Sequence, residues 1–210
     1  MTRPLTKPAL LAATMLLMSA LAQASVPAAD SVSPQELVRD TSARMLTALR
    51  EEREAIRQDS GRLYQLVSTI VLPYFDFERM SMWVLGRNWR DATPQQRERF
   101  VEQFRVLLVR TYGSALSDYA DEKIVYLPFV DTSKEGRVTV RTEIEQGGTV
   151  IPISYSMYKS DAGWKVYDVV ISGVSLVTNY RSTFGTIIRE QGMDNLIQQL
   201  SERNAGATGG

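Results

Sequence analysis

The spacing of apolar residues changes twice along this 210-residue chain, and these changes constrain the fold more than any other feature. From Ser33 to about residue 119, apolar residues recur every three or four positions, as in an amphipathic α-helix. From about Lys123 they alternate with polar residues, as in a strand with one buried and one solvated face. Helical spacing returns at Val174. This order predicts an α+β fold, with helices packed on one face of a curved antiparallel sheet.

Two helix starts can be recognised from capping-box sequences. Ser33 and Glu36 flank a Pro that suits the first helical position. Thr93 and Gln96 repeat this arrangement. The helix expected after the second start, near residues 93–119, has a wide apolar stripe of large side chains, so we expect it to face the centre of the domain.

Turn sequences divide the alternating region into antiparallel strands. Gln146-Gly147-Gly148 is typical of a tight hairpin turn, and Ser160 to Gly163 predicts another. The predicted strands cover residues 124–127, 138–145, 150–158 and 164–172.

The first 24 residues have the layout of a cleaved secretory signal. Arg3 and Lys7 provide a positive start, and Ala9 to Leu21 is apolar but shorter than the about 20 residues that span a bilayer. Ala22-Gln23-Ala24 has the small-x-small pattern of a cleavage site. We expect residues 1–24 to be removed and the mature protein to lie in the periplasm. The alternative is a buried N-terminal helix.

The remaining chain is expected to form one domain. Residues 25–203 contain no repeat and no linker, and their length suits a single core. Residues 204–210 are rich in Gly and Ala and are predicted to be a disordered tail.

Two residue types are missing, and their absence narrows the chemistry. The chain has no Cys and no His. It therefore has no disulfide, no thiolate nucleophile and none of the commonest metal ligands, and no metal or cofactor is expected. Catalysis by carboxylates or by Lys and Tyr remains possible, although no motif indicates it.

The charge balance argues against electrostatic partners. The chain has 24 basic and 24 acidic residues, and the signal contains Arg3, Lys7 and no acid, so the mature formal charge is −2. This balance predicts no nucleic-acid binding. Any contact with lipid is expected to depend on apolar surface.

The apolar face of the predicted sheet allows two interpretations. A filled core and the wall of an apolar cavity have the same periodicity, so the pattern does not separate them. Large flexible side chains such as Met157 and Phe104 lie near small residues such as Gly113 and Gly173, a mixture that suits an irregular cavity.

Several sequence blocks resemble one known family. They are Phe75-Asp76-Phe77, Leu85 to Arg90, Thr93-Pro94, Arg110-Thr111-Tyr112, Gly163 to Arg181, Phe184 and Gly192 to Ile197. Over essentially the whole mature chain, these blocks resemble the periplasmic phospholipid-binding proteins of the Mla system for maintenance of lipid asymmetry, also called the toluene-tolerance family.

The resemblance implies a fold similar to the nuclear-transport-factor-2 superfamily, with an apolar cavity between sheet and helices. It further implies a soluble carrier, not an enzyme, that moves phospholipid between the outer and inner membranes. The implied partners are an outer-membrane lipoprotein–porin complex and an inner-membrane ABC transporter with a lipid-binding ring. Phospholipid would be cargo, and no cofactor is implied.

We expect the acyl chains to lie between the helix at 93–119 and the sheet at 138–172, with the headgroup at the mouth. Each candidate for the cavity wall could equally be an ordinary core residue. The candidates are Leu85, Phe104, Leu108, Tyr112, Val140, Ile153, Tyr155, Met157, Val166, Val169, Val174, Val177 and Phe184.

Other classes of function remain open at this point. A related fold could support an enzyme with Asp76 and Tyr112 as an acid–base pair. A periplasmic carrier or chaperone for acylated protein would need a similar cavity. A scaffold with a filled core would hold no ligand.

Two groups of cations also allow two interpretations. Arg87 and Arg90 flank Trp89 and either contact a headgroup or partner, or pair with acids such as Asp76 or Asp168 around a buried Trp. Arg181 is similarly ambiguous.

Overall fold

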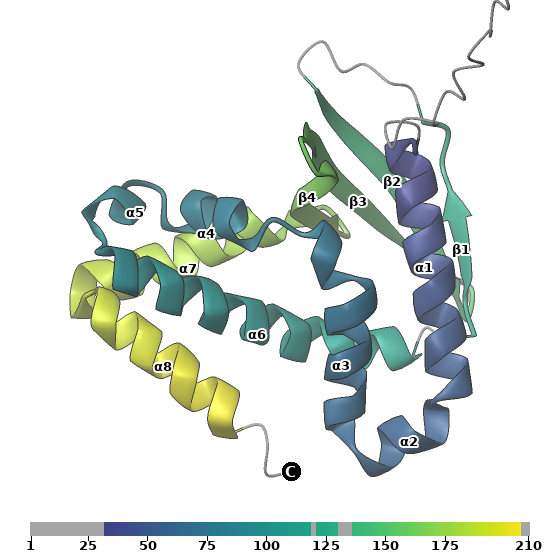
Figure 1. Cartoon of the computed structure of the whole chain (residues 1–210), viewed down its shortest axis with the longest axis horizontal. Coiled ribbons are helices and arrows are strands. Elements are labelled where there is room, and N and C mark those ends of the chain that lie inside the picture. The colour runs from purple at the N-terminus through teal and green to yellow at the C-terminus, as the bar shows by residue number, and fades with distance from the viewer. Residues whose placement is uncertain (1–31, 119–120, 130–135, 207–210) are drawn as a thin grey trace, which may run out of the picture. The chain divides into compact units, whose positions relative to one another are not determined.

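A five-stranded antiparallel sheet in the order β1-β2-β3-β4-β5 forms the centre of the structure (Figure 1). The computed structural model describes residues 32–118, 121–129 and 136–206; the predicted signal and residues 207–210 of the predicted tail lie outside them. The strands are β1 (Lys123–Tyr126), β2 (Arg137–Gln146), β3 (Thr149–Ser160), β4 (Gly163–Ile171) and β5 (Val174–Ser175).

The strand register places the alternating apolar residues on one face of the sheet. Val140 lies opposite Tyr155, which in turn lies opposite Val169. Burial alternates along β2 as the period of two predicts. Gly147 and Gly148 both have positive φ, which a tight hairpin turn requires. The predicted α+β fold with a curved antiparallel sheet is confirmed.

Both predicted capping boxes form. Glu36 N donates to Ser33 Oγ at 3.1 Å, and Gln96 N donates to Thr93 Oγ1 at 3.2 Å. In each box a second hydrogen bond runs the other way: Ser33 N donates to the Glu36 side chain, and Thr93 N donates to the Gln96 side chain. The helices are α1 (Pro34–Glu51), α2 (Arg53–Gln58), α3 (Ser60–Ile70), the 3₁₀ turn η1 (Leu72–Tyr74), α4 (Phe77–Leu85), α5 (Arg87–Asp91), α6 (Pro94–Asp118), α7 (Leu176–Gln191) and α8 (Met193–Gly206).

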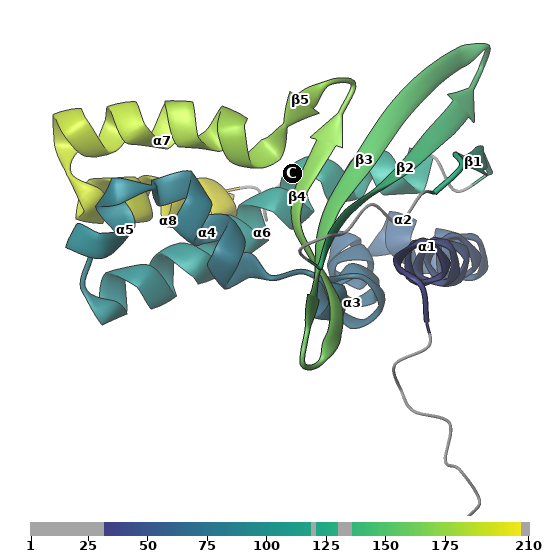
Figure 2. The same cartoon turned by 90° about the horizontal axis from the view of Figure 1, so that it is seen from above.

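The helices form two groups that α6 connects. α1 to α3 lie on one side of the sheet, whereas α4, α5, α7 and α8 lie beyond β4 (Figures 1 and 2). α1 is attached to the β1 side of the sheet, since Gln35 donates to Leu127 O at 2.8 Å and the Arg39 guanidinium lies 4.3 Å from the centre of the Tyr126 ring.

Buried apolar side chains follow this division and form two separate clusters. The larger cluster joins the sheet to α4, α6, α7 and α8, and to α1 through Val38. It includes Phe100, Phe104, Met157, Phe184 and Leu196. The smaller cluster joins α1 and α3 to α6, and consists of Met45, Leu49, Leu66, Val67, Ile70 and Val109. The described residues therefore form two cores within one fold.

Two predicted boundaries are wrong. Val174 belongs to β5, and the helix begins only at Leu176, because Asp168 and Ser175 satisfy its first backbone N–H groups. At the other end, α8 continues to Gly206, three residues into the predicted tail. Asn204 is buried there and donates to Gln103 O at 3.0 Å, which fixes this last turn against α6.

The α4–α5 junction depends on the glycine at its centre. Gly86 has φ +56°, and a Cβ there would lie 3.0 Å from the Arg181 guanidinium. We expect Gly86→Ala to lower the free energy of unfolding by about 1–3 kcal/mol, because this conformation strains any other residue. Gly185→Ala in α7 is the control: its Cβ would meet nothing within 4 Å, and it should stabilise by about 0.5–1 kcal/mol. Urea unfolding of both variants measures the difference.

Candidate ligand-binding site

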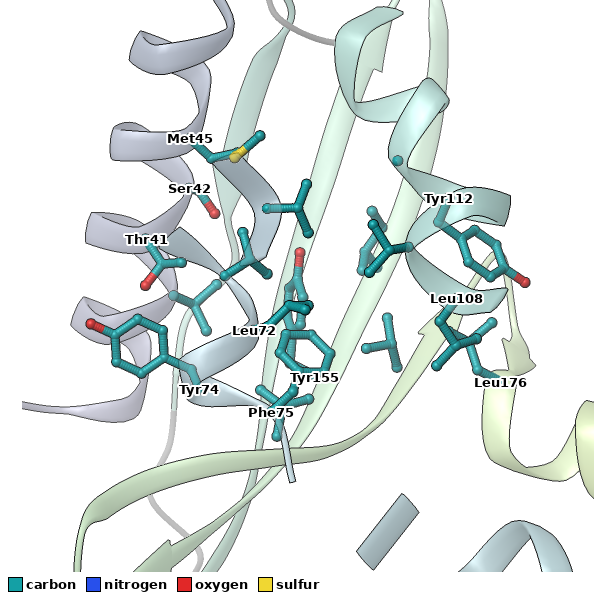
Figure 3. A pocket seen from close by; sticks show the side chains of 18 of the residues that line it. Thr41, Ser42, Met45, Leu72, Tyr74, Phe75, Leu108, Tyr112, Tyr155 and Leu176 are labelled. Carbon is teal, nitrogen blue, oxygen red and sulfur yellow. The ribbon is translucent and has the colours of Figure 1, made fainter. Parts of the chain in front are cut away.

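An apolar cavity of about 250 Å³ lies between the two cores. Its walls come from the apolar face of the sheet and from α1, α3, η1, α4 and α6, with Leu176 at the start of α7 (Figure 3). An apolar cavity of about 150 Å³ already holds a benzene molecule. Space of this size in a well-packed fold therefore indicates a site for an apolar ligand.

The sheet wall follows directly from strand alternation. Ile153, Tyr155 and Met157 project from β3 to the same side, and β4 adds Val166 and Val169. Met157 and Val166 are almost completely buried, whereas Ile153 and Tyr155 are half-buried. The middle of the sheet therefore presents a continuous apolar surface to the cavity.

The opposite wall comes from α1 and the segment that follows α3. Leu37, Met45 and Leu49 line the cavity from α1, and Leu72 and Tyr74 from η1. The apolar spacing that begins after Ser33 predicts a stripe of apolar residues on this helix, but periodicity alone does not indicate which other element the stripe faces. In Figure 3, Thr41, Ser42 and Met45 project from α1, whereas Leu108 and Tyr112 project from α6 on the other side of the cavity.

The structure brings seven of the thirteen predicted wall residues together around the cavity. They are Leu108, Tyr112, Ile153, Tyr155, Met157, Val166 and Val169. These residues lie in the second half of α6 and the middle of the sheet, which form two of the cavity's walls.

The other six predicted residues lie away from the cavity lining. Leu85, Phe104, Val177 and Phe184 belong to the larger core, where Phe104 and Phe184 contact each other edge to face. Val140 is fully buried within the same core. Val174 is 54 % exposed at the start of β5. Sequence periodicity separates buried from exposed faces, but it does not distinguish two cores that share one helix.

Among the described residues, no side chain that is ionised at neutral pH lines the cavity. Its polar groups are hydroxyls, contributed by Thr41, Ser42, Tyr74, Tyr112 and Tyr155. Burial raises the pKa of Tyr155 to about 12. Burial, and secondarily the neighbouring Tyr180, raise the pKa of Tyr112 to about 12. Both phenols are therefore neutral at physiological pH and act as hydrogen-bonding groups in an otherwise apolar site.

These phenols predict a loss of stability in alkali. A raised pKa in the folded state means that stability is complete below pH 10, the unfolded value, and falls as the pH rises from 10 to 12. We expect Tyr155→Phe to reduce the size of this fall, because Phe has no proton to lose. Urea unfolding at several pH values between 8 and 12 tests this, and an unchanged pH profile in the variant would contradict it.

Asp76, the proposed acid of an enzyme, is engaged in structural contacts outside the cavity lining. It accepts from Arg79 N at 2.9 Å, which caps α4, and from Tyr158 Oη at 2.5 Å. The Arg79 guanidinium lies 3.5 Å from Asp76 and 3.7 Å from the centre of the Tyr158 ring. Tyr112 lines the cavity, whereas Asp76 lines a separate shallow polar pocket, so the structure does not unite the two in one site.

One interpretation of the sequence pairs Arg87 and Arg90 with acids such as Asp76 or Asp168. Neither pairing is found among the described residues. Asp168 accepts from Val177 N at 3.1 Å and from Ser175 Oγ at 2.7 Å, so it holds the start of α7. Trp89 packs against the larger core, and its carbonyl accepts from Arg97 Nε at 2.8 Å. The first backbone N–H groups of a helix need hydrogen-bond acceptors. Asp76 serves this purpose at the start of α4, and Asp168 at the start of α7.

The described residues contain no cluster of three or more acidic side chains that could hold a metal ion. In the same part of the chain, no helix combines the length and hydropathy needed to cross a membrane. The cavity is bounded by apolar side chains and hydroxyls, and its shape and surface suit an apolar ligand.

Known proteins are similar to this chain in sequence. The MlaC protein family matches residues 39–202. The intermembrane phospholipid transport system binding protein MlaC of Haemophilus influenzae is 28 % identical over 174 residues, 81 % of each chain. The toluene tolerance protein ttg2D of Pseudomonas putida is 27 % identical over 164 residues, 77 % of this chain and 76 % of that protein.

A solved structure shows the same fold with a ligand. The phospholipid-binding protein of Ralstonia solanacearum, in complex with a phospholipid, is 32 % identical, with a TM-score of 0.78 over 83 % of this chain and 98 % of that one. The 210-residue chain, whose residues 39–202 match the family, therefore belongs to the MlaC family.

Proposed function

We propose that this protein is a periplasmic carrier that holds the acyl chains of a phospholipid in the cavity between α1, α6 and the sheet. The observation that carries the proposal is the cavity itself, which is lined by apolar side chains and neutral hydroxyls. The phospholipid in the Ralstonia structure and the transport function in the name of the Haemophilus relative support it.

An apolar cavity suits a carrier because acyl chains bind it much more favourably than they dissolve in water, but not more favourably than they remain in a membrane. Each CH₂ group moved out of water gains about 0.8 kcal/mol, so two chains of about 15 carbons gain roughly 20–25 kcal/mol. Moving the same chains from a bilayer gains almost nothing, since the bilayer is also apolar. Lipid held in this way can be exchanged with membranes, and the direction of transport must come from a partner that uses energy.

The state of the polar side chains argues against catalysis as the main function. The proposed acid, Asp76, is held by Tyr158 and Arg79, and the cavity hydroxyls of Tyr112 and Tyr155 have raised pKa values. Phenols with such raised pKa values are poor proton donors and acceptors at neutral pH. We therefore propose a binding protein without a cofactor.

The cellular setting follows from the predicted signal and the family. We propose that the mature chain, from about Ser25, works in the periplasm between an outer-membrane lipoprotein–porin complex and an inner-membrane ABC transporter with a lipid-binding ring. Its role would be to maintain the lipid asymmetry of the outer membrane.

Native purification followed by lipid mass spectrometry tests the proposal. The mature protein is isolated from the periplasm without detergent, and its bound material is extracted with organic solvent. We expect phospholipid in a fixed ratio to protein. An acylated peptide in the extract would support the chaperone alternative instead, and a lipid-free protein that takes up no lipid from vesicles would contradict both.

A further inference from the structure

Among the described residues that line the cavity, only Gly113 has no side chain. It lies in α6 and is buried. A Cβ at this position would lie 3.8 Å from Leu63 of α3 and 3.8 Å from Val109 of α6. Val109 belongs to the smaller core and Leu63 packs against that core. Gly113 therefore lies where the cavity meets the smaller core.

The described surroundings of Gly113 give no steric reason for a glycine. A separation of 3.8 Å is ordinary van der Waals contact, so an alanine side chain would fit. Gly113 is also not one of the glycines with positive φ. A glycine inside a helix destabilises the fold relative to alanine. Gly113 therefore lowers stability, and what it provides in return is space in the cavity wall.

Two hydroxyl groups lie on another side of the cavity. Thr41 projects from α1, and Tyr74 of η1 lies beside it (Figure 3). Leu49, which lines the cavity from the smaller core, is about 12 Å further along α1 than Thr41, at a rise of about 1.5 Å per residue. The cavity therefore has hydroxyl groups near the start of α1 and apolar side chains near the end of α1.

The other two phenols of the cavity have partners within the protein. The Tyr112 side chain forms a hydrogen bond with Tyr180, and the Tyr155 side chain forms one with Thr142. The ester oxygens of a phospholipid need hydrogen-bond donors when they are buried, whereas the ends of its acyl chains need none. The ester groups therefore fit best near Thr41 and the chain ends near the smaller core.

We propose that Gly113 sets the length of acyl chain that the cavity accepts. The bare backbone of α6 at this position leaves room for the ends of long chains, and any side chain there takes up that room. Gly113 is thus a specificity-determining residue for the ligand, and this inference rests on the proposed function.

Chain length affects binding only when part of the chain does not fit. A methylene group that moves from a bilayer into the cavity gains almost nothing, since both are apolar. A methylene group that the cavity excludes is exposed to water instead, which lowers affinity about fourfold for each group. Exclusion of about two methylene groups by a leucine side chain would lower affinity for a long-chain lipid about tenfold.

Competition between two lipids tests the proposal on the natively purified mature protein. The vesicles contain equal amounts of deuterium-labelled dimyristoleoyl- and dioleoyl-phosphatidylglycerol, which share the headgroup and the number of double bonds but differ in chain length. Mass spectrometry measures the ratio of the two lipids on the protein. Relative to the unmodified protein, Gly113→Leu should shift this ratio about tenfold towards the shorter lipid, and Gly113→Ala about threefold.

Gly185 of α7 provides the matched control. It does not line the cavity, and a Cβ there would meet nothing within 4 Å. Gly185→Leu and Gly185→Ala should leave the lipid ratio unchanged. In urea unfolding, both Gly113→Ala and Gly185→Ala should raise the midpoint, because alanine favours a helix. A lower midpoint for Gly113→Ala would show that packing requires the glycine, and would overturn the proposal.

The lipid measurement separates this inference from the proposed function. If the unmodified protein takes up neither lipid, the proposed function is contradicted and this inference with it. If the unmodified protein takes up both lipids, an unchanged ratio in the folded Gly113 variants would overturn the inference alone. Equal loss of both lipids from Gly113→Leu would also overturn it, because the side chain would then block the cavity without selecting for length.

Discussion

Replacing Ile153 with Asp is expected to remove nearly all bound phospholipid from the purified protein. Ile153 lines the cavity from β3 and is half-buried there. A carboxylate at this position would have to lose its water to contact acyl chains, and burying an unpaired charge costs several kcal/mol. We expect at least about a tenfold fall in lipid phosphate per protein, since each 1.4 kcal/mol corresponds to tenfold in binding.

The neighbouring residue on the same face provides the control. Ile151 has the same side chain, the same strand and the same class of exposure, but it does not line the cavity. Ile151→Asp should keep its lipid. If both variants lose lipid equally, the effect would come from the sheet in general. If Ile153→Asp retains a full load, the acyl chains do not lie against β3.

Replacing Phe104 with Ala is expected to have the opposite profile, with a large loss of stability and little loss of lipid. Phe104 is fully buried in the larger core, where its ring packs against the rings of Phe100, Tyr180 and Phe184. Truncation of a buried Phe costs about 3–5 kcal/mol through lost contacts and the void left behind. Urea unfolding should show this fall, and the variant should still carry phospholipid at low temperature.

Leu108, one turn further along α6, is the matched comparison because it lines the cavity. Leu108→Ala should change lipid retention more than Phe104→Ala does, because its side chain faces the ligand. If lipid is lost from Phe104→Ala while the protein remains folded, the site extends into the larger core, contrary to the geometry described here.

The sequence predicts the local structure well because local structure depends on neighbouring residues. The capping boxes at Ser33 and Thr93 form as expected, and the alternation from Val138 to Glu145 correctly separates the two faces of β2. The turn at Gly147 also forms, since a positive φ is most easily adopted by glycine.

The position of the site depends on contacts between distant segments, which periodicity does not encode. The stripe on α1 predicts a buried face, but the sequence does not indicate that this face closes a cavity against β3. Phe104 and Leu108 follow each other on the same face of α6 and both belong to the larger core, yet only Leu108 also lines the cavity. Arg181 and Gly86 are 95 positions apart, and only the fold brings them together.

The placement of charged groups was harder to predict for a similar reason. Asp168 lies among apolar neighbours in its strand, which indicates that it needs a partner. The observed partners are Ser175 and the backbone of Val177, not an arginine. A short β4–β5 turn brings the start of α7 back to Asp168, and the sequence pattern predicts the end of the strand but not this return.

Photo-crosslinking is the most direct test of the central claim that acyl chains occupy the cavity between the two cores. The protein is loaded with a phospholipid that carries a diazirine near the end of an acyl chain, irradiated, and analysed by peptide mass spectrometry. We predict labels on cavity residues such as Met45 of α1, Leu108 of α6 and Met157 of β3. Labels confined to the outer face of the sheet or to α8, with the cavity residues unlabelled, would contradict the claim.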